Sequence, residues 1–356
     1  MNAPARPPVR DDLQALEGYH SPQVDVAVRL NTNESPFPAP AAFTAALAER
    51  VATIDWHRYP DREAHALRED IAALHDVAPE QILVANGSNE VLQAVCLAYG
   101  GAGRTAVVFE PTYRLHSHIA AVTGTTVVEG GRAPDLSLDP AEVRRVLAEA
   151  RPAITFACSP NNPTGMIEDP DVLAELVDLA PGVVVVDEAY AQFAPWSALS
   201  LMDGERPLVV TRTFSKTWSM AAVRLGYLVA PAWLVAQLEG VILPYHVDAL
   251  KQEAGRLALR FRDDMERRVA AIVEERGRVV AAMADLPVQL WPSGANFLLF
   301  RPLEADGHEV WQGLLDRSVL VRDCSSWPGL EGTLRVTVGT QAEDDAFLDA
   351  LREVLA

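Results

Sequence analysis

The chain has 356 residues, 49% of them hydrophobic and 22% charged, which is typical of a folded globular protein long enough for two domains. Its formal charge of −19 argues against nucleic-acid binding, because a phosphate backbone requires a basic face and no cluster of Lys and Arg is visible. No run approaches the about 18 apolar residues of a membrane span, and residues 1–20 lack the apolar core of a signal peptide. We therefore expect a cytoplasmic protein without nucleic-acid or membrane partners.

The three cysteines, Cys96, Cys158 and Cys324, lie far apart in the sequence. They form no CxxC or Cys/His spacing, so neither a disulfide framework nor a metal site is expected. Any anionic ligand must be held by local arginines, because the overall charge of the chain is unfavourable.

The first half of the chain alternates between strand and helix patterns after an ordered loop at 28–38. Expected helices are 39–51, 63–75, 91–99, 139–150 and 172–179, with another that opens near residue 110; expected strands are 81–85, 105–109, 125–129, 153–157 and 182–187. Successive strand-then-helix units predict a mainly parallel sheet, whose ligand crevice lies beyond the carboxyl ends of the strands.

The second half predicts a strand at 208–211, an edge strand at 226–230 and a long charged helix that reaches about Asp285, with Gly255 and Gly277 as weak points. The remainder predicts a smaller α+β domain, with strands at 288–291, 295–300, 319–322 and 333–338 and helices at 308–317 and 342–355. The fold class is α/β. The expected division is an N-terminal segment 1–45 packed with the small domain, a large domain 46–245, a bridging helix 246–285 and a small domain 286–356.

Two features at the predicted crevice suggest ligand contacts. Residues 86–90, Asn-Gly-Ser-Asn-Glu, follow a strand and open a helix, where free N–H groups and the helix dipole either form an anion site or serve as an ordinary cap. Asp187 follows four consecutive valines, which are typical of a central buried strand. A carboxylate there is costly unless paired, so we expect a salt bridge or a cofactor contact.

Lys216 lies in a run of small and hydroxylic residues, between the cations Arg212 and Arg224. A lysine kept dry near other cations has a lowered pKa, so its free amine can react with an aldehyde. An arginine nearby suits a phosphate group on the same aldehyde. For a lone lysine, an exposed loop position remains the alternative.

Four motifs occur in order at the predicted crevice: Asn162-Pro-Thr-Gly165, Asp187-Glu-Ala-Tyr190, Ser215-Lys216 and Arg224-Leu-Gly226. Over nearly its whole length the chain resembles the fold-type I aminotransferases that use pyridoxal phosphate. The resemblance implies a large domain with a mainly parallel sheet that binds the cofactor. A regulator that holds the cofactor and binds DNA is not supported, because the sequence shows no basic helix-turn-helix segment. A nucleotide-dependent dehydrogenase is rejected because Gly101-Ala-Gly103 follows a predicted helix, whereas the dinucleotide-binding motif follows a strand.

The resemblance implies roles for individual residues. Lys216 matches the lysine that forms an imine with the cofactor, and Asp187 the carboxylate that keeps the pyridine nitrogen protonated. Tyr190 and Asn162 match the pair that hydrogen-bonds the ring hydroxyl, and Tyr113 the residue that stacks on the ring. The cofactor phosphate is expected to contact Ser88, Asn89, Thr213, Ser215 and Arg224, together with Tyr59 from a neighbouring subunit, which implies a homodimer.

Within the family, segments 30–34, 58–61, 87–90, 111–113, 159–165 and 334–340 resemble the histidinol-phosphate aminotransferases. That resemblance implies transfer of an amino group between glutamate and imidazole acetol phosphate in histidine biosynthesis. Arg335 matches the arginine that binds the carboxylate of glutamate and the phosphate of the other substrate. Arg322 and Tyr19 match further residues that contact this phosphate, and Asn33 lies on the loop expected to cover the site. For Arg322 a structural ion pair is the alternative.

Three residues depart from the usual pattern of that subfamily: Trp218, His246 and Cys324. They leave the identity of the amino acceptor open, because one or two side chains decide between imidazole and phenyl. The alternatives are therefore an aromatic amino acid aminotransferase and a lyase similar to threonine-phosphate decarboxylase.

Overall fold

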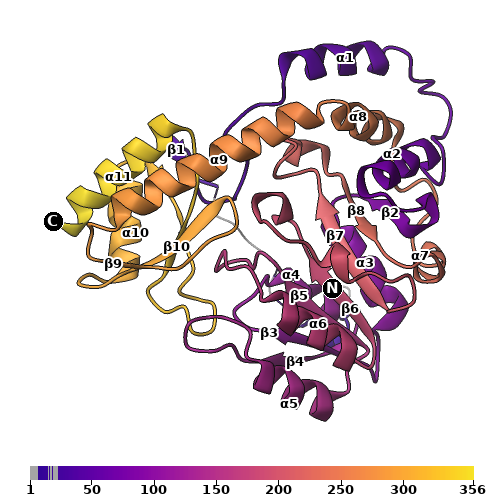
Figure 1. Ribbon diagram of the computed structural model, residues 1–356, viewed down its shortest axis with the longest axis horizontal. Coiled ribbons are helices and arrows are strands. Elements are labelled where there is room, and N and C mark those ends of the chain that lie inside the picture. The colour runs from indigo at the N-terminus through magenta and orange to yellow at the C-terminus, as the bar shows by residue number, and fades with distance from the viewer. Residues whose placement is uncertain (1–6, 15, 17, 19–22) are drawn as a thin grey trace, which may run out of the picture.

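The computed structural model describes residues 7–14, 16, 18 and 23–356. Its larger lobe is built on a seven-stranded sheet with the order β2-β8-β7-β6-β5-β3-β4 (Figure 1). The strands are β2 (Ile82–Ala85), β3 (Thr105–Phe109), β4 (Thr126–Gly130), β5 (Ile154–Cys158), β6 (Val183–Asp187), β7 (Leu208–Thr213) and β8 (Gly226–Val229). Strands β3 to β7 pair in parallel, which confirms the predicted fold class.

Helices cover both faces of this sheet. The helices of the larger lobe are α1 (Ala41–Val51), which packs on α8, and α2 (His65–His75), α3 (Ser88–Tyr99), α4 (Leu115–Val122), α5 (Pro140–Ala150), α6 (Pro170–Leu179), α7 (Ala232–Glu239) and α8 (Ala249–Leu259). Helices α3, α4 and α7 pack on one face, and α2, α5, α6 and α8 pack on the other. Asp139 and Asp169 cap α5 and α6, each followed by a proline at the first helical position, where a missing N–H costs no hydrogen bond.

Strand β6 shows why the valine run indicates a central strand. Val183 and Val185 pack into the core on the α3 face, whereas Val184 and Val186 pack into the core on the α6 face. Because side chains alternate along a strand, a strand covered on both faces needs apolar residues at every position. Asp187 follows at the carboxyl end, where the apolar cover stops.

The prediction that strand 226–230 lies at an edge of the sheet is wrong. β8 lies second from the edge, antiparallel to both β7 and β2, and β2 and β4 are the edge strands. All four residues of β8 are buried, as an interior strand requires. A short apolar run does not reveal its neighbours, so the sequence alone could not order these strands.

The smaller lobe holds a four-stranded antiparallel sheet and a two-stranded parallel ribbon. Its strands are β9 (Val288–Leu290), β10 (Phe297–Pro302), β12 (Arg322–Asp323) and β13 (Leu334–Thr337) in the sheet, and β1 (Val28–Arg29) and β11 (Val319–Leu320) in the ribbon. The strand expected at 319–322 is therefore split between two sheets. Helices α9 (Arg262–Met283), α10 (Gly307–Asp316) and α11 (Gln341–Leu355) pack on this lobe.

The long helix expected to end near Asp285 is two helices, α8 and α9, which separate at Arg260 and Phe261. Neither glycine marks the break. A Cβ on Gly255 would lie 2.6 Å from Leu225 and 2.9 Å from Leu67, so this glycine permits close packing, whereas Gly277 faces open space. In Figure 1, α9 extends from the smaller lobe towards α8 on the larger one.

The division of the chain at residues 45, 245 and 285 stays a prediction. β1 pairs with β11 of the smaller lobe, while α1, which includes residue 45, contacts α8 of the larger one. Within the described ranges, no helix is both long enough and apolar enough to cross a membrane.

Two glycines with opposite surroundings give a test of this packing. A Cβ at Gly226 would lie 2.4 Å from the backbone nitrogen of Ser88, so Gly226→Ala should destabilise the fold by about 1–3 kcal/mol or more. Gly277→Ala, inside α9 with no atom in reach, should stabilise it by about 0.5–1 kcal/mol. Thermal unfolding midpoints should therefore move in opposite directions; a Gly226→Ala protein as stable as the parent would contradict the packing.

Candidate active site

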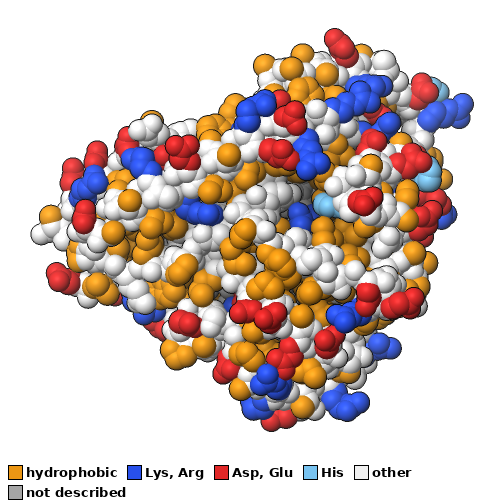
Figure 2. Space-filling model, in the orientation of Figure 1, with side chains coloured by type: hydrophobic (Ala, Val, Ile, Leu, Met, Phe, Trp, Pro, Cys, Tyr) orange, Lys and Arg blue, Asp and Glu red, His pale blue; other side chains and the backbone are white. Residues whose placement is uncertain are grey.

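A cavity of about 410 Å³ opens where the carboxyl ends of the parallel strands face the smaller lobe. Figure 2 shows a depression between the lobes with basic side chains inside it. The predicted residues that line the cavity are Asn33, Ser88, Asn89, Tyr113, Asn162, Asp187, Tyr190, Thr213, Ser215, Lys216, Arg224, Arg322 and Arg335. The structure therefore brings together residues that the sequence scatters over about 300 positions.

One predicted residue does not line the cavity, and another lies outside the described part of the chain. Tyr59 lies on the surface with 82% of its side chain exposed, stacked on Tyr245 at 4.6 Å between ring centroids. Tyr19 lies outside the described residues.

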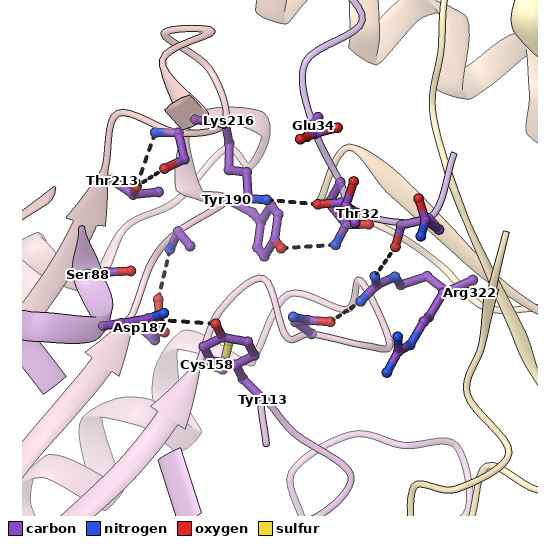
Figure 3. A pocket seen from close by; sticks show the side chains of 18 of the residues that line it. Thr32, Glu34, Ser88, Tyr113, Cys158, Asp187, Tyr190, Thr213, Lys216 and Arg322 are labelled. Atoms are coloured by element: carbon purple, nitrogen blue, oxygen red, sulfur yellow. Dashed lines mark hydrogen bonds between the residues drawn. The ribbon is translucent and has the colours of Figure 1, made fainter. Parts of the chain in front are cut away.

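Lys216 follows β7 and enters the cavity beside Tyr190 (Figure 3). Its Nζ donates a hydrogen bond of 3.1 Å to the carbonyl of Thr32 and lies 5.7 Å from the centre of the Tyr190 ring. The pKa of Lys216 is lowered to about 8, chiefly by burial and then by the nearby guanidinium of Arg335, while Glu34 acts in the opposite direction. A substantial fraction of the amine is thus neutral near pH 7 to 8, as reaction with a carbonyl requires.

The cations that act on Lys216 are not the pair predicted from its neighbours in sequence. Arg224 is one of them, but Arg212 binds Glu188 on the other side of β7, with 2.9 Å from Nε to the carboxylate. The larger effect comes from Arg335, which is 119 positions away in the sequence. Only the fold reveals such a neighbour.

Glu188, the residue after Asp187, makes structural contacts outside the cavity. Besides Arg212 it accepts hydrogen bonds from the hydroxyl of Ser197 at 2.8 Å and the amide of Ala198 at 2.6 Å. These contacts satisfy a fully buried carboxylate away from the cavity lining.

Asp187 is buried at the end of β6 and is held from several directions. One carboxylate oxygen lies 3.1 Å from Nε2 of His116, and the other accepts from the amide of Ala189 and the hydroxyl of Thr211 at 3.1 and 3.2 Å. These contacts fix the carboxylate at the cavity floor, where it can accept a hydrogen bond from an N–H group of a ligand.

His116 is a site residue that sequence reasoning missed. It is fully buried, stacks on Phe156 with 4.9 Å between ring centroids, and its Nδ1 finds no hydrogen-bond partner in the part of the chain that is described. Its place three positions after Tyr113 was an available signal, but nothing in the sequence links it to Asp187.

A small concave group of donors lies at the start of α3. Ser88 and Asn89 open this helix, while Thr213, Ser215 and Arg224 approach from the β7–β8 connection. The Thr213 hydroxyl donates to Ser215 Oγ at 2.9 Å, and Arg224 Nη1 lies 3.4 Å from the same oxygen. Free N–H groups, hydroxyls and one guanidinium suit a phosphate.

Gly87, which has no side chain, allows Arg224 to lie close to the start of α3. A Cβ at Gly87, whose φ is +80°, would lie 2.9 Å from Nη2 of Arg224, inside the distance that real Cβ contacts show. Arg224 itself has a left-handed backbone, with φ of 57°. A strained residue that turns its charge towards a helix N-terminus is typical of a binding site.

Between these two groups lie side chains that suit an aromatic ligand. Tyr113 donates to Asn89 Oδ1 at 3.3 Å, and the hydroxyl of Tyr190 accepts from Asn33 at 3.0 Å. Burial raises the pKa of Tyr190, so its hydroxyl keeps its proton. In Figure 3, Tyr113 and Tyr190 lie on different sides of the cavity.

The wall from the smaller lobe carries two arginines on paired strands. Arg322 of β12 lies opposite Arg335 of β13, so both side chains are on the same face of the sheet. Arg335 is buried and donates to Asn162 Oδ1 and, at 2.9 Å, to the carbonyl of Asn31. Two guanidinium groups on one wall suit the anionic groups of a substrate.

The three departures from the subfamily pattern do not line the cavity. Trp218 is buried against Phe214, Cys324 is fully buried, and His246 bonds the carbonyl of Val84 at 2.9 Å beside a separate pocket of about 220 Å³. Within the described ranges, no group of three or more His, Cys, Asp or Glu side chains could hold a metal ion.

The model of the aminotransferase class I and II family matches residues 25–351. A histidinol-phosphate aminotransferase from Frankia casuarinae is 46% identical over 98% of this chain and 90% of its own length, and one from Streptomyces avermitilis is 45% identical over 98% and 96%. Among solved structures, the histidinol-phosphate aminotransferase from Sinorhizobium meliloti in complex with pyridoxal-5'-phosphate superposes with a TM-score of 0.89, at 22% identity, over 99% of this chain and 98% of that one. The match of the family model over most of the chain and the 45–46% identity to these relatives show that this chain belongs to the aminotransferase class I and II family.

Proposed function

We propose that this chain transfers an amino group between glutamate and imidazole acetol phosphate, as a histidinol-phosphate:2-oxoglutarate aminotransferase of histidine biosynthesis. The observation that carries the proposal is one cavity in which a lysine of lowered pKa faces a buried carboxylate, a phosphate-sized group of donors and two further arginines. Relatives that are 42–46% identical over 98% of the chain, all named histidinol-phosphate aminotransferase, support the substrate.

The cavity residues fit pyridoxal phosphate. When bound, this cofactor supplies an aldehyde for the amino group and a ring that takes up electrons from the substrate carbon. Ser88, Asn89, Thr213, Ser215 and Arg224 would hold its phosphate through N–H groups, hydroxyls and charge.

The ring would be held by four further side chains. Asp187 would keep a proton on the ring nitrogen, Tyr190 and Asn162 would hydrogen-bond the ring hydroxyl, and Tyr113 would stack on the ring face. His116 would act as a positioning residue, because it contacts Asp187 and does not line the cavity.

Lys216 would serve as the point of covalent attachment and as the group that moves the proton at the substrate carbon. Its lowered pKa favours both roles, because a neutral amine is needed to attack the aldehyde and to accept a proton. A general base of this kind typically contributes about 10²- to 10⁴-fold to the rate.

Substrate anions would be bound on the opposite wall. Arg335 would bind the carboxylate of glutamate and the phosphate of the second substrate, and Arg322 and Tyr19 would add phosphate contacts. Asn33 lies on the loop 31–34, which lines the cavity and would exclude water from the reacting groups.

We also propose a homodimer in the cytoplasm. Tyr59 and Tyr245 stack at 4.6 Å between ring centroids and are 82% and 41% exposed, and such an exposed aromatic pair favours an interface. Three buried, unpaired thiols, Cys96, Cys158 and Cys324, support a reducing compartment.

The function is tested by half-reactions of the purified holoenzyme. Glutamate should convert the aldehyde absorbance of the cofactor to that of the amine form, and histidinol phosphate should do so with a higher kcat/KM than phenylalanine. Faster reaction with phenylalanine would favour an aromatic amino acid aminotransferase. Release of carbon dioxide from threonine phosphate, without conversion by glutamate, would favour the decarboxylase.

The two adjacent carboxylates should differ sharply in their effect on activity. Asp187→Asn should lower the rate of the glutamate half-reaction by at least about 10²-fold, because it removes a charge aimed at the reacting group. Glu188→Gln is the matched control. It should lower the unfolding midpoint, since Arg212 loses its buried partner, but leave the half-reaction rate of folded protein within about threefold. Equal loss of activity in both variants would contradict the assignment.

The dimer proposal predicts a shared cofactor site. Sedimentation should give twice the chain mass of 38.6 kDa, and Tyr59→Ala should weaken cofactor binding about tenfold through loss of one hydrogen bond to a charged group. Mixing Tyr59→Ala subunits with Lys216→Ala subunits should restore tight binding at the intact lysine. A monomeric holoenzyme, or no restoration in the mixture, would refute the sharing.

A further inference from the structure

One indole, that of Trp327, is contacted by arginines from both lobes. Trp327 lies in the loop between β12 and β13 and is 4% exposed. The guanidinium carbon of Arg322 lies 5.3 Å from its ring centroid, and that of Arg114, which precedes α4 in the larger lobe, lies 5.1 Å away. Both distances fall within the about 6 Å range of cation–π attraction.

Hydrogen bonds join the same loop to the larger lobe. Nε1 of Trp327 donates to the carbonyl of Thr112 at 3.0 Å, and Nη2 of Arg114 donates to the carbonyl of Ser326 at 3.1 Å. Thr112 and Arg114 flank Tyr113, which lines the cavity. The indole therefore connects a cavity arginine of one lobe with the residues on either side of a cavity tyrosine in the other.

We propose that Trp327 is a positioning residue that fixes the guanidinium of Arg322 at the cavity wall for the phosphate of the second substrate. An arginine has many rotamers, and stacking on a buried ring reduces the entropy that it loses when it binds an anion. The identity of that substrate rests on the proposed function.

The effect should be specific to anions that use Arg322. Arg335 is held by Asn162 and the carbonyl of Asn31, and its guanidinium lies over Phe297 at 5.1 Å. None of these contacts involves Trp327. A substrate carboxylate bound by Arg335 should therefore be little affected by a change at Trp327.

The test compares holoenzymes of the parent chain, Trp327→Leu, Arg322→Gln and the double variant. Inorganic phosphate is the probe, measured as a competitive inhibitor of the glutamate half-reaction, together with KM for histidinol phosphate. Trp327→Leu should raise the phosphate inhibition constant and this KM by about three- to tenfold, the loss expected for a partly buried cation–π contact. KM for glutamate should stay within about twofold. In the Arg322→Gln background, Trp327→Leu should add nothing, because the group that it positions is gone.

Trp291 offers a matched control. It belongs to the same buried cluster as Trp327 and carries Arg301 at 5.4 Å, but neither residue lines the cavity. Trp291→Leu should cost similar packing and leave phosphate inhibition unchanged. If Trp327→Leu fails to fold, Arg114→Gln tests the same contact from an exposed position, with an expected two- to threefold weaker inhibition that disappears in Arg322→Gln.

Four results would overturn the proposal: parent-like inhibition in Trp327→Leu, parent-like inhibition in Arg114→Gln, a full additional loss in the Arg322→Gln background, or an equal effect of Trp291→Leu. Absence of turnover with histidinol phosphate in the parent enzyme would refute the proposed substrate instead. Weaker phosphate inhibition in Trp327→Leu would then still support the positioning of Arg322.

Discussion

The site depends on keeping the amine of Lys216 partly dry and close to other positive charge. Burial alone lowers the pKa of a lysine, because the charged form loses its hydration. Arg335 and Arg224 lower it further, and Glu34 and Asp187 limit the effect. The balance places the pKa at about 8, where the amine can change its protonation state under physiological conditions. An exposed lysine would keep a pKa near its ordinary value of about 10.4 and stay protonated at neutral pH.

The parallel sheet is what makes this arrangement possible. Strands β3 to β7 are parallel, and β2 runs in the same direction because β8 is antiparallel to both β2 and β7. The residues after β2, β3, β5, β6 and β7 therefore meet at one edge although they are far apart in sequence. Each polar residue lies at the end of a buried apolar strand, where the helices no longer cover the sheet. The smaller lobe contributes Arg322 and Arg335 to the opposite wall of the cavity. The layered core of sheet and helices therefore buries the amine of Lys216, the carboxylate of Asp187 and the donors at the start of α3.

Much of this could be read from the chain, and the failures have physical reasons. Local signals located the valine strand, the helix start at Ser88 and Lys216, because alternation, capping and small residues act over a few positions. The antiparallel insertion of β8, the contact of His116 with Asp187 and the effect of Arg335 on Lys216 were not foreseen. Each depends on partners more than 70 positions apart, where sequence periodicity carries no information. Resemblance to a family assigns roles to the site residues, but it does not identify the neighbouring groups, such as His116 and Arg335, that affect their charge and position.

The net charge of −19 opposes the binding of anionic substrates at long range, but it has little effect at short range. Exposed charges are screened over about 8 Å at physiological ionic strength, whereas buried and partly buried charges are screened much less. The cavity is lined by four basic side chains, Lys216, Arg224, Arg322 and Arg335, and by two carboxylates, Glu34 and Asp187. These nearby groups act on a bound anion more strongly than the distant acidic surface does. The acidic exterior instead reduces nonspecific binding of polyanions, and affinity for a small anion is left to the geometry of the arginines. Positioning these side chains is therefore where selectivity for a phosphorylated substrate can arise.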